Sequence, residues 1–254
     1  MARRTAKRLR LSRSMSLTAQ ASAPQAGVSI KEHLSIRHLR SAALLASQAR
    51  RMEADITQTV EWSPAAQRRW DQCAALADAC ILTAVAGVEA AINELYIGAQ
   101  SASSHDGLSD LLRAKLAALW PDGIKKRKGV SKILLKYESA LDCVEAVNGS
   151  VVRPATDGVE LLIETRNALT HAREEFRPAA PQGPATLWLP LEQKLRARVA
   201  PSLLTPPSAM YLWCRVLGAP LAEWAFVTAH EYASTAYAAL GATNIFANER
   251  SWLT

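Results

Sequence analysis

The sequence has few aromatic residues and no apolar run of the length expected for a membrane span. Phe, Trp and Tyr make up 6% of the 254 residues. The most apolar stretch, ACILTAVAGVEAAI at 79–92, is short, contains Glu89 and follows Asp78. Because a spanning helix needs about 20 consecutive apolar residues, we expect a core helix here and no membrane partner.

Cysteine pairs and the common catalytic motifs are also missing. Cys73, Cys80, Cys143 and Cys214 form no CxxC pair and no cluster with His, which argues against a zinc site. The sequence has no P-loop, GxGxxG or GxSxG motif, and HEY at 230–232 is not HExxH because position 234 is Ser. We expect buried thiols in a reducing, cytoplasmic setting, with no metal and no cofactor.

Acidic residues are absent before Glu32, so the net charge of +7 is unevenly placed. Residues 1–31 carry seven Lys and Arg, and the remaining 223 residues balance to zero. The pI of about 9.4 therefore describes a tail rather than a basic fold. We expect residues 1–31 to be disordered. Four interpretations of this segment stay open. It could be a solvated tail, a basic arm for RNA or acidic lipid, or a transit peptide, or translation could truly start at Met15.

What the sequence does contain is helical periodicity in an alanine-rich chain. Ser63 followed by Pro64 is a helix start signal, and apolar residues then recur at three- and four-residue spacing to residue 99. Asp157 and Glu160 resemble a capping box that starts a later helix. The spacing predicts helices over 33–55, 65–99, 108–119, 130–148, 157–173 and 207–240, the last with a break near Gly218, and a short strand is possible at 186–189. We therefore predict an all-α bundle in a single domain, residues 32–250.

A basic loop, PDGIKKRKG at 121–129, separates two of these helices. It contains four consecutive cations, Lys125, Lys126, Arg127 and Lys128. These side chains are candidates for contact with an RNA backbone, and a simple solvated loop is the alternative.

The stretch ELLIETRNALTHAREE at 160–175 combines apolar residues with several polar ones. On a helical wheel Arg166 falls at one edge of an apolar face and His171 at the other. Asn167 lies one turn before His171. Glu164 lies one turn before Asn167 and is a candidate supporting residue of the site. Ile163 falls opposite the core face, where a partner subunit would explain it. The apolar face itself consists of Leu161, Leu162, Ala168, Leu169 and Ala172.

These polar residues suit RNA cleavage without a metal. Cleavage needs a base for the 2′-hydroxyl proton, and histidine is the residue type suited to this role at neutral pH, which makes His171 the candidate base. It also needs a cation at the phosphate, which the guanidinium of Arg166 supplies. Asn167 could hold either group. The alternative is a structural Arg–His pair beside a subunit interface. Glu89 and Asn93, spaced i, i+4, could support the site or form an ordinary polar edge.

The sequence RNALTH at 166–171 resembles the Arg–polar–x–x–x–His signature of HEPN domains. AVAGVEAAINELY at 84–96 is similar to the Ala-rich helix that precedes this motif in many bacterial members, and 221–240 is similar to their closing helix. The family's Arg, polar residue and His correspond to Arg166, Asn167 and His171. Glu89 matches an acidic position that is often present in the earlier helix.

The resemblance implies a small all-α module that forms a homodimer and cleaves RNA without metal. It also implies a toxin–antitoxin or anti-phage role, with an antitoxin protein as a further partner. One subset of the family has a Tyr two residues after the His, where this chain has Arg173, so nucleotidylation of that position is not expected. The alternative is a non-catalytic HEPN protein that binds nucleotide, RNA or a protein partner.

Overall fold

The computed structural model of the chain describes residues 33–54, 63–101, 107–120, 123–124, 127–171, 189–204 and 216–247. All of these residues belong to one compact unit that begins at His33. The expected tail, residues 1–31, lies outside the described residues. The described residues contain helices and no strand, so the prediction of an all-α fold is confirmed.

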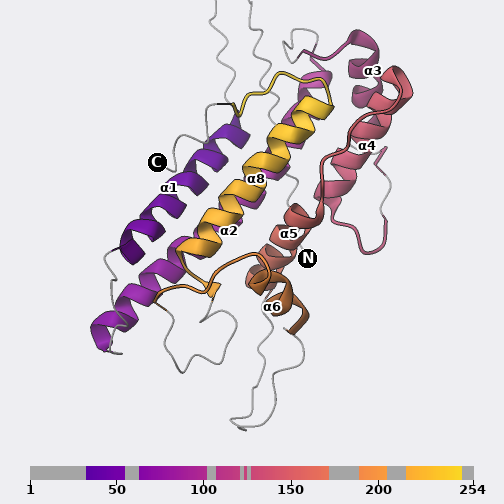
Figure 1. Cartoon of the computed structure of the whole chain (residues 1–254). Helices are drawn as coiled ribbons and strands as arrows, with labels where there is room; N and C mark the ends of the chain where they lie inside the picture. The colour runs from indigo at the N-terminus through magenta and orange to yellow at the C-terminus, as the bar shows by residue number, and fades with distance from the viewer. Residues whose placement is uncertain are drawn as a thin grey trace, which may run out of the picture. The chain divides into compact units, whose positions relative to one another are not determined.

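Three long helices pack against one another at the centre of this unit: α1 (Leu34–Ala54), α2 (Pro64–Ala99) and α8 (Ala219–Ala239). They run alongside each other in Figure 1. Their contact faces are rich in alanine, which lets the helix axes approach closely. At Gly87 a Cβ atom would lie 2.9 Å from the side chain of Leu39, so any larger residue at that position would have to displace Leu39 of α1.

Two shorter helices, α3 (Asp110–Leu119) and α4 (Lys132–Asn148), pack on each other and on α2. Buried tyrosines fix α4 and α8 to α2. The hydroxyl of Tyr137 donates to the carbonyl oxygen of Val88 at 2.8 Å, and that of Tyr237 donates to the carbonyl oxygen of Ala91 at 2.8 Å. Each tyrosine thus buries its ring while its polar atom is satisfied by a backbone acceptor.

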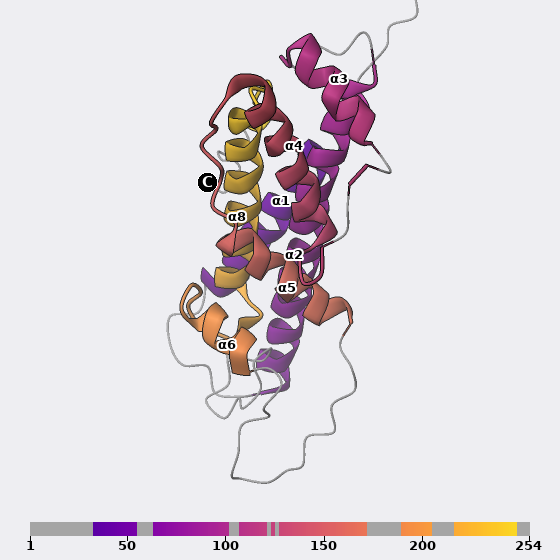
Figure 2. The same ribbon diagram turned by 90° about the vertical axis from the view of Figure 1, so that its right-hand side faces the viewer.

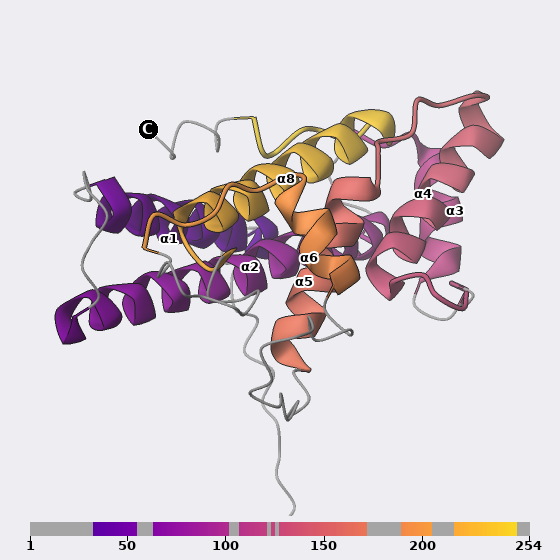
Figure 3. The ribbon, with the colours of Figure 1, turned by 60° about the horizontal axis from the view of Figure 1, so that its bottom comes forward.

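Helices α5 (Asp157–Thr170) and α6 (Leu189–Arg196) complete the described unit. Helix α5 contacts α2, α8 and α6. Figure 1 shows α1 and α5 on opposite sides of α8, and the turned view in Figure 2 shows α6 next to α5. The last turns of α5 extend beyond α2 in Figure 3. The motif helix is therefore anchored in the bundle by its first half.

Most predicted helix boundaries agree with the structure. Ser63 accepts a hydrogen bond from the backbone nitrogen of Ala66 at 3.2 Å and caps α2, as predicted. The predicted break near Gly218 is also confirmed, because α8 begins at Ala219, whereas residues 205–215 lie outside the described residues. The possible strand at 186–189 is wrong for Leu189, which is the first residue of α6. Its other three residues lie outside the described residues.

Two carboxylates, the half-buried Glu94 and the buried Glu53, join elements that are distant in sequence. Glu94 of α2 accepts hydrogen bonds from the backbone nitrogen and the hydroxyl of Ser35, at 2.8 and 2.6 Å, and so caps the start of α1. Glu53 of α1 accepts from the Ser202 hydroxyl at 2.6 Å and from the backbone nitrogen of Ala219 at 2.9 Å. Glu53 therefore stabilises the start of α8, where unpaired backbone N–H groups favour negative charge.

Helix α2 is long and apolar enough to cross a membrane by length and composition, with a mean hydropathy of 1.8 over its most apolar window. Half of that window is buried within the fold. Core helices of soluble proteins share these properties, so hydropathy alone does not distinguish a core helix from a membrane-spanning one.

Cys73 and Cys80 lie on the buried side of this helix, and burial raises the pKa of both thiols to about 12.

Candidate functional site

Helix α5, which carries the Arg–Asn–x–x–x–His motif, begins at Asp157, whereas a capping box would require Asp157 to be the N-cap residue that precedes the helix. Thr156 is the N-cap residue and Asp157 is the first helical residue, and no side-chain capping bond is formed. The predicted capping box is therefore wrong. Asp157 and Glu160 still lie in the first turn, where negative charge is favourable to the helix dipole.

The first half of α5 is buried on more sides than a single apolar face provides. Ile163 is only 3% exposed, so the expectation that it lies on an outer surface is wrong. Thr165 is buried as well, and its hydroxyl donates to the carbonyl oxygen of Leu161 at 2.7 Å. The reason is that α5 packs against three helices, α2, α8 and α6. Ile163 therefore gives no support to a partner subunit.

The second half of α5 is less buried than the wheel predicted. Ala168 and Leu169 are half-buried and pack against the edge of the core, and Ala172 lies outside the described residues. Helix α5 ends at Thr170, so His171 is the C-cap residue rather than a residue within the helix. The transition from buried to exposed falls within the motif itself.

Arg166 is half-buried and lies at this transition. Its Nε atom is buried and has no hydrogen-bond partner. A guanidinium group carries five N–H donors in a planar fork and stays charged at all physiological pH values. A buried donor without an acceptor costs free energy, about 1 to 3 kcal/mol. An anionic group that reached Arg166 would therefore gain a charged partner with an unused donor.

Asn167 and His171 are exposed, and neither side chain is hydrogen-bonded to another described residue. The backbone nitrogen of His171 donates to the carbonyl oxygen of Asn167 at 2.9 Å, which fixes the last turn of α5. The hydroxyl of Thr170 donates to the carbonyl oxygen of Arg166 at 2.8 Å. The structure thus places all three motif residues at one end of α5, two of them open to solvent.

Glu164 has a partner outside the motif. Its carboxylate accepts from Nζ of Lys194 at 2.7 Å, which joins α5 to α6. Both side chains are about half exposed, so the pair adds little to stability. It does link the exposed end of α5 to its neighbouring helix. The supporting role of Glu164 in the candidate site stays a prediction.

Glu89 and Asn93 lie together on α2, and both bind a residue that the sequence analysis did not single out. The ammonium group of Lys136 donates to Glu89 at 3.2 Å and to Asn93 at 2.7 Å. Lys136 is almost fully buried and also lies over the ring of Trp120, with Nζ 5.4 Å from its centroid. The lysine within the apolar run ILLKY was the signal that could have revealed this cluster, because a buried Lys needs a charged partner.

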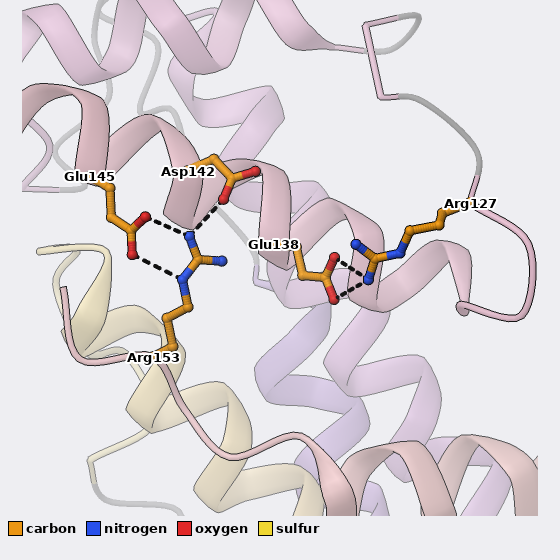
Figure 4. Close-up of polar contacts among 5 residues, drawn as sticks. All are labelled: Arg127, Glu138, Asp142, Glu145 and Arg153. Carbon is orange, nitrogen blue, oxygen red and sulfur yellow. Dashed lines mark hydrogen bonds and ion pairs between the residues drawn. The ribbon is translucent and has the colours of Figure 1, made fainter. Parts of the chain in front are cut away.

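The basic loop is partly engaged in ion pairs. Lys125 and Lys126 lie outside the described residues, and Lys128 is exposed. Arg127 binds both oxygens of Glu138, at 2.8 and 2.9 Å (Figure 4). An RNA phosphate at Arg127 would have to compete with that carboxylate.

A second arginine, Arg153, binds the same helix as Arg127. It donates to Asp142 at 2.6 Å and to both oxygens of Glu145 at 2.8 and 2.9 Å, as Figure 4 shows. The hydrogen bonds from Arg153 lower the pKa of the Glu145 carboxyl group. Because Arg153 lies in the connector between α4 and α5, the ion pairs hold the chain just before the motif helix.

A cleft of about 650 Å³ opens between α3 and α4, and Lys115, Arg127, Glu138 and Cys143 are in its wall.

No family model, curated protein or solved structure matches this chain. The resemblance to HEPN domains therefore depends on the residues of the motif and its flanking helices. The class that the fold defines is an all-α bundle with a polar motif at the free end of one helix.

Proposed function

We propose that the protein is a metal-independent endoribonuclease of the HEPN type. The observation that supports the proposal is the placement of Arg166, which has a buried Nε without a partner beside the exposed Asn167 and His171. Other cations on this chain, such as Lys136 and Arg153, are bound to carboxylates. A charged group left without an acceptor is typical of a site that receives an anion.

The proposed reaction uses the three residues in separate roles. His171 takes the proton of a ribose 2′-hydroxyl, and the resulting oxygen attacks the adjacent phosphorus. The bond from phosphorus to the 5′-oxygen breaks, and that oxygen takes a proton from solvent. The products are a 2′,3′-cyclic phosphate and a 5′-hydroxyl. Arg166 stabilises the charge that develops on the phosphate oxygens, and Asn167 orients the phosphate or the imidazole.

The resemblance also supports a homodimer, in which a second copy would bring another α5 to the site. It further suggests a cytoplasmic toxin or anti-phage effector, controlled by an antitoxin protein. The toxin or anti-phage role depends on the cleavage activity, whereas the dimer can be tested separately.

The test is to incubate purified full-length protein with labelled RNA in EDTA, while light scattering gives the oligomeric state of the same sample. We expect cleavage that leaves a cyclic phosphate, in a sample with the mass of a dimer. His171→Ala and Arg166→Ala should each reduce the rate by about a hundredfold or more. Arg166→Lys should recover only part of the loss, because an ammonium group lacks the planar fork.

Arg69→Ala is the matched control, because Arg69 is exposed on α2 at a distance in sequence from the motif. It should cleave at the wild-type rate. Intact RNA with the wild-type protein, or equal cleavage by wild type and both motif variants, would refute the nuclease proposal. A monomer that cleaves RNA would refute the dimer.

One observation favours a second candidate function. Catalytic histidines are usually oriented by a hydrogen bond to one ring nitrogen, and the ring of His171 has no such partner among the described residues. A non-catalytic protein that binds nucleotide, RNA or a protein partner through Arg166 would need no orienting bond. In that case the wild-type protein would bind RNA without cutting it, and Arg166→Ala would weaken binding more than His171→Ala.

A further inference from the structure

The cleft between α3 and α4 is a groove formed by one face of each helix. On α3 its wall consists of Lys115 and the residues three and four positions later, Ala118 and Leu119. The wall residues of α4 have the same helical spacing and are Leu135, Glu138, Ser139, Asp142, Cys143 and Ala146. At 1.5 Å per residue this stretch of α4 is about 16 Å long. With a volume of about 650 Å³, the groove has the size of a small-molecule site and an elongated form.

The apolar part of the cleft wall is aliphatic. It consists of Ala118, Leu119, Leu135 and Ala146. Among the described residues no aromatic ring lines the cleft. Proteins usually hold an unpaired nucleobase by stacking it on aromatic rings. The wall therefore suits an alkyl chain better than a base.

The carboxylates of the cleft wall already have partners. Arg127 binds both oxygens of Glu138, at 2.8 and 2.9 Å, and Arg153 donates to Asp142 at 2.6 Å (Figure 4). A cationic ligand would have to compete with these two guanidinium groups. The acidic side chains of the cleft thus do not favour a cation.

Among the described residues of the wall, Lys115 is the cation that has no carboxylate partner. It is half-buried and forms no hydrogen bond or ion pair with another described residue. Burial raises the pKa of the Cys143 thiol, and the positive charge of Lys115 opposes that rise, so the ammonium group acts across the groove. The hydroxyl of the half-buried Ser139 also has no hydrogen-bond partner in the described part of the chain. An anionic head group would find two unused donors here.

We propose that this cleft is a binding site for an aliphatic carboxylic acid. The alkyl chain lies along the groove against Leu119 and Leu135, and the carboxylate accepts hydrogen bonds from Nζ of Lys115 and from the hydroxyl of Ser139. Removal of apolar surface from water drives binding, and the ion pair with Lys115 fixes the direction of the chain. The inference goes beyond the proposed function and does not depend on it, because α3, α4 and the segment between them form the cleft.

The test measures binding of decanoate to full-length protein by calorimetry, at concentrations below those at which decanoate forms micelles. Decylamine has a chain of the same length and a cationic head, and it should bind at least about tenfold more weakly. Saturation with decanoate should slow alkylation of Cys143 by iodoacetamide about tenfold, because the thiol becomes covered. Peptide mass spectrometry measures the alkylation of Cys143 separately from that of the other cysteines.

Two variants separate the head-group contact from the groove. Lys115→Gln removes the ammonium group and should weaken decanoate binding by about tenfold. Ala118→Phe fills part of the cleft from an exposed position of α3 and should abolish binding. Lys132→Gln is the matched control and should bind as the wild type does, because Lys132 is exposed on α4 and does not line the cleft. Circular dichroism establishes that all three variants are folded.

Several outcomes would overturn the proposal. These are no binding of decanoate, equal binding of decanoate and decylamine, and unchanged alkylation of Cys143 when decanoate is bound. Equal affinities of Lys115→Gln and Lys132→Gln would overturn it as well. A nucleoside monophosphate that protected Cys143 more strongly than decanoate would assign the cleft to a nucleotide instead.

Discussion

Glu53 and Arg166 are both charged residues near the end of a helix that packs into the core, yet their surroundings differ. The buried carboxylate of Glu53 accepts bonds from the Ser202 hydroxyl and from the backbone nitrogens of Leu203 and Ala219. Arg166 is half-buried, and its Nε has no acceptor. The fold therefore supplies partners for one charge and leaves the other without any.

The space around the two residues differs in the same way. At Gly218, a Cβ atom would lie 2.4 Å from both the carboxylate of Glu53 and the hydroxyl of Ser202, so nothing else can enter. Asn167 and His171, beside Arg166, are open to solvent. We infer that Glu53 acts on the fold itself, whereas the end of α5 is available to a ligand.

The largest effect that this comparison predicts is on stability, at Glu53. Glu53→Ala leaves several buried donors without an acceptor and creates a cavity, so the free energy of unfolding should fall by about 3 kcal/mol or more. Glu53→Gln keeps the volume and one acceptor and should lose about half as much. Urea unfolding followed by circular dichroism measures both. A loss under about 1 kcal/mol for Glu53→Ala would show that the carboxylate is not the main link between α1 and α8.

A sharper comparison replaces two cations by the same apolar side chain. Lys136→Met removes the bonds to Glu89 and Asn93 and should lower the free energy of unfolding by about 1 to 2 kcal/mol. Arg166→Met removes a buried donor that has no hydrogen bond to lose, so the free energy of unfolding should not fall and should rise by about 1 to 2 kcal/mol.

In RNA assays Arg166→Met should lose more activity than Lys136→Met, which is the reverse of their order in loss of stability. Arg166→Met should lose cleavage, or RNA binding if the protein is not catalytic, whereas Lys136→Met should keep either activity in its folded fraction. If Arg166→Met unfolds as readily as Lys136→Met, Arg166 is a structural residue and the comparison between the two regions fails.

The helices could be predicted from the sequence because their signals are local. Ser63 with Pro64 fixes the start of α2, and the alanine spacing of α1 and α2 reports one buried face per helix. Helix α5 differs because three helices cover it. A wheel assigns a single apolar face, so it could not show that Ile163 is buried on the side away from the predicted core.

The residues of the candidate site also fall into two groups, those that could be predicted from the sequence and those that could not. Arg166, Asn167 and His171 are close in sequence, and helical periodicity brings them to one end of α5. The partners of Glu89 and Asn93 could not be predicted, because Lys136 comes from a helix more than 40 residues away.

The smallest predicted effect tests whether an unpartnered charge costs stability in this fold at all. Asp78 of α2 is half-buried, and its Oδ1 has no hydrogen-bond partner. Burial raises the pKa of Asp78 to about 6, above its unfolded value near 4. The folded state therefore binds more protons between these two pH values, and ionisation of Asp78 lowers stability as the pH rises from about 4 to about 6.

Asp78→Asn should stabilise the protein at pH 7 by about 1 kcal/mol, a figure reduced for solvent access, and by almost nothing below pH 4. Asp71→Asn, at an exposed position of the same helix, is the matched control, because it removes a carboxylate that is not buried. If urea unfolding gives the same difference at pH 4 and pH 7, burial of Asp78 carries no cost, and the missing partner of Arg166 loses its meaning as a sign of function.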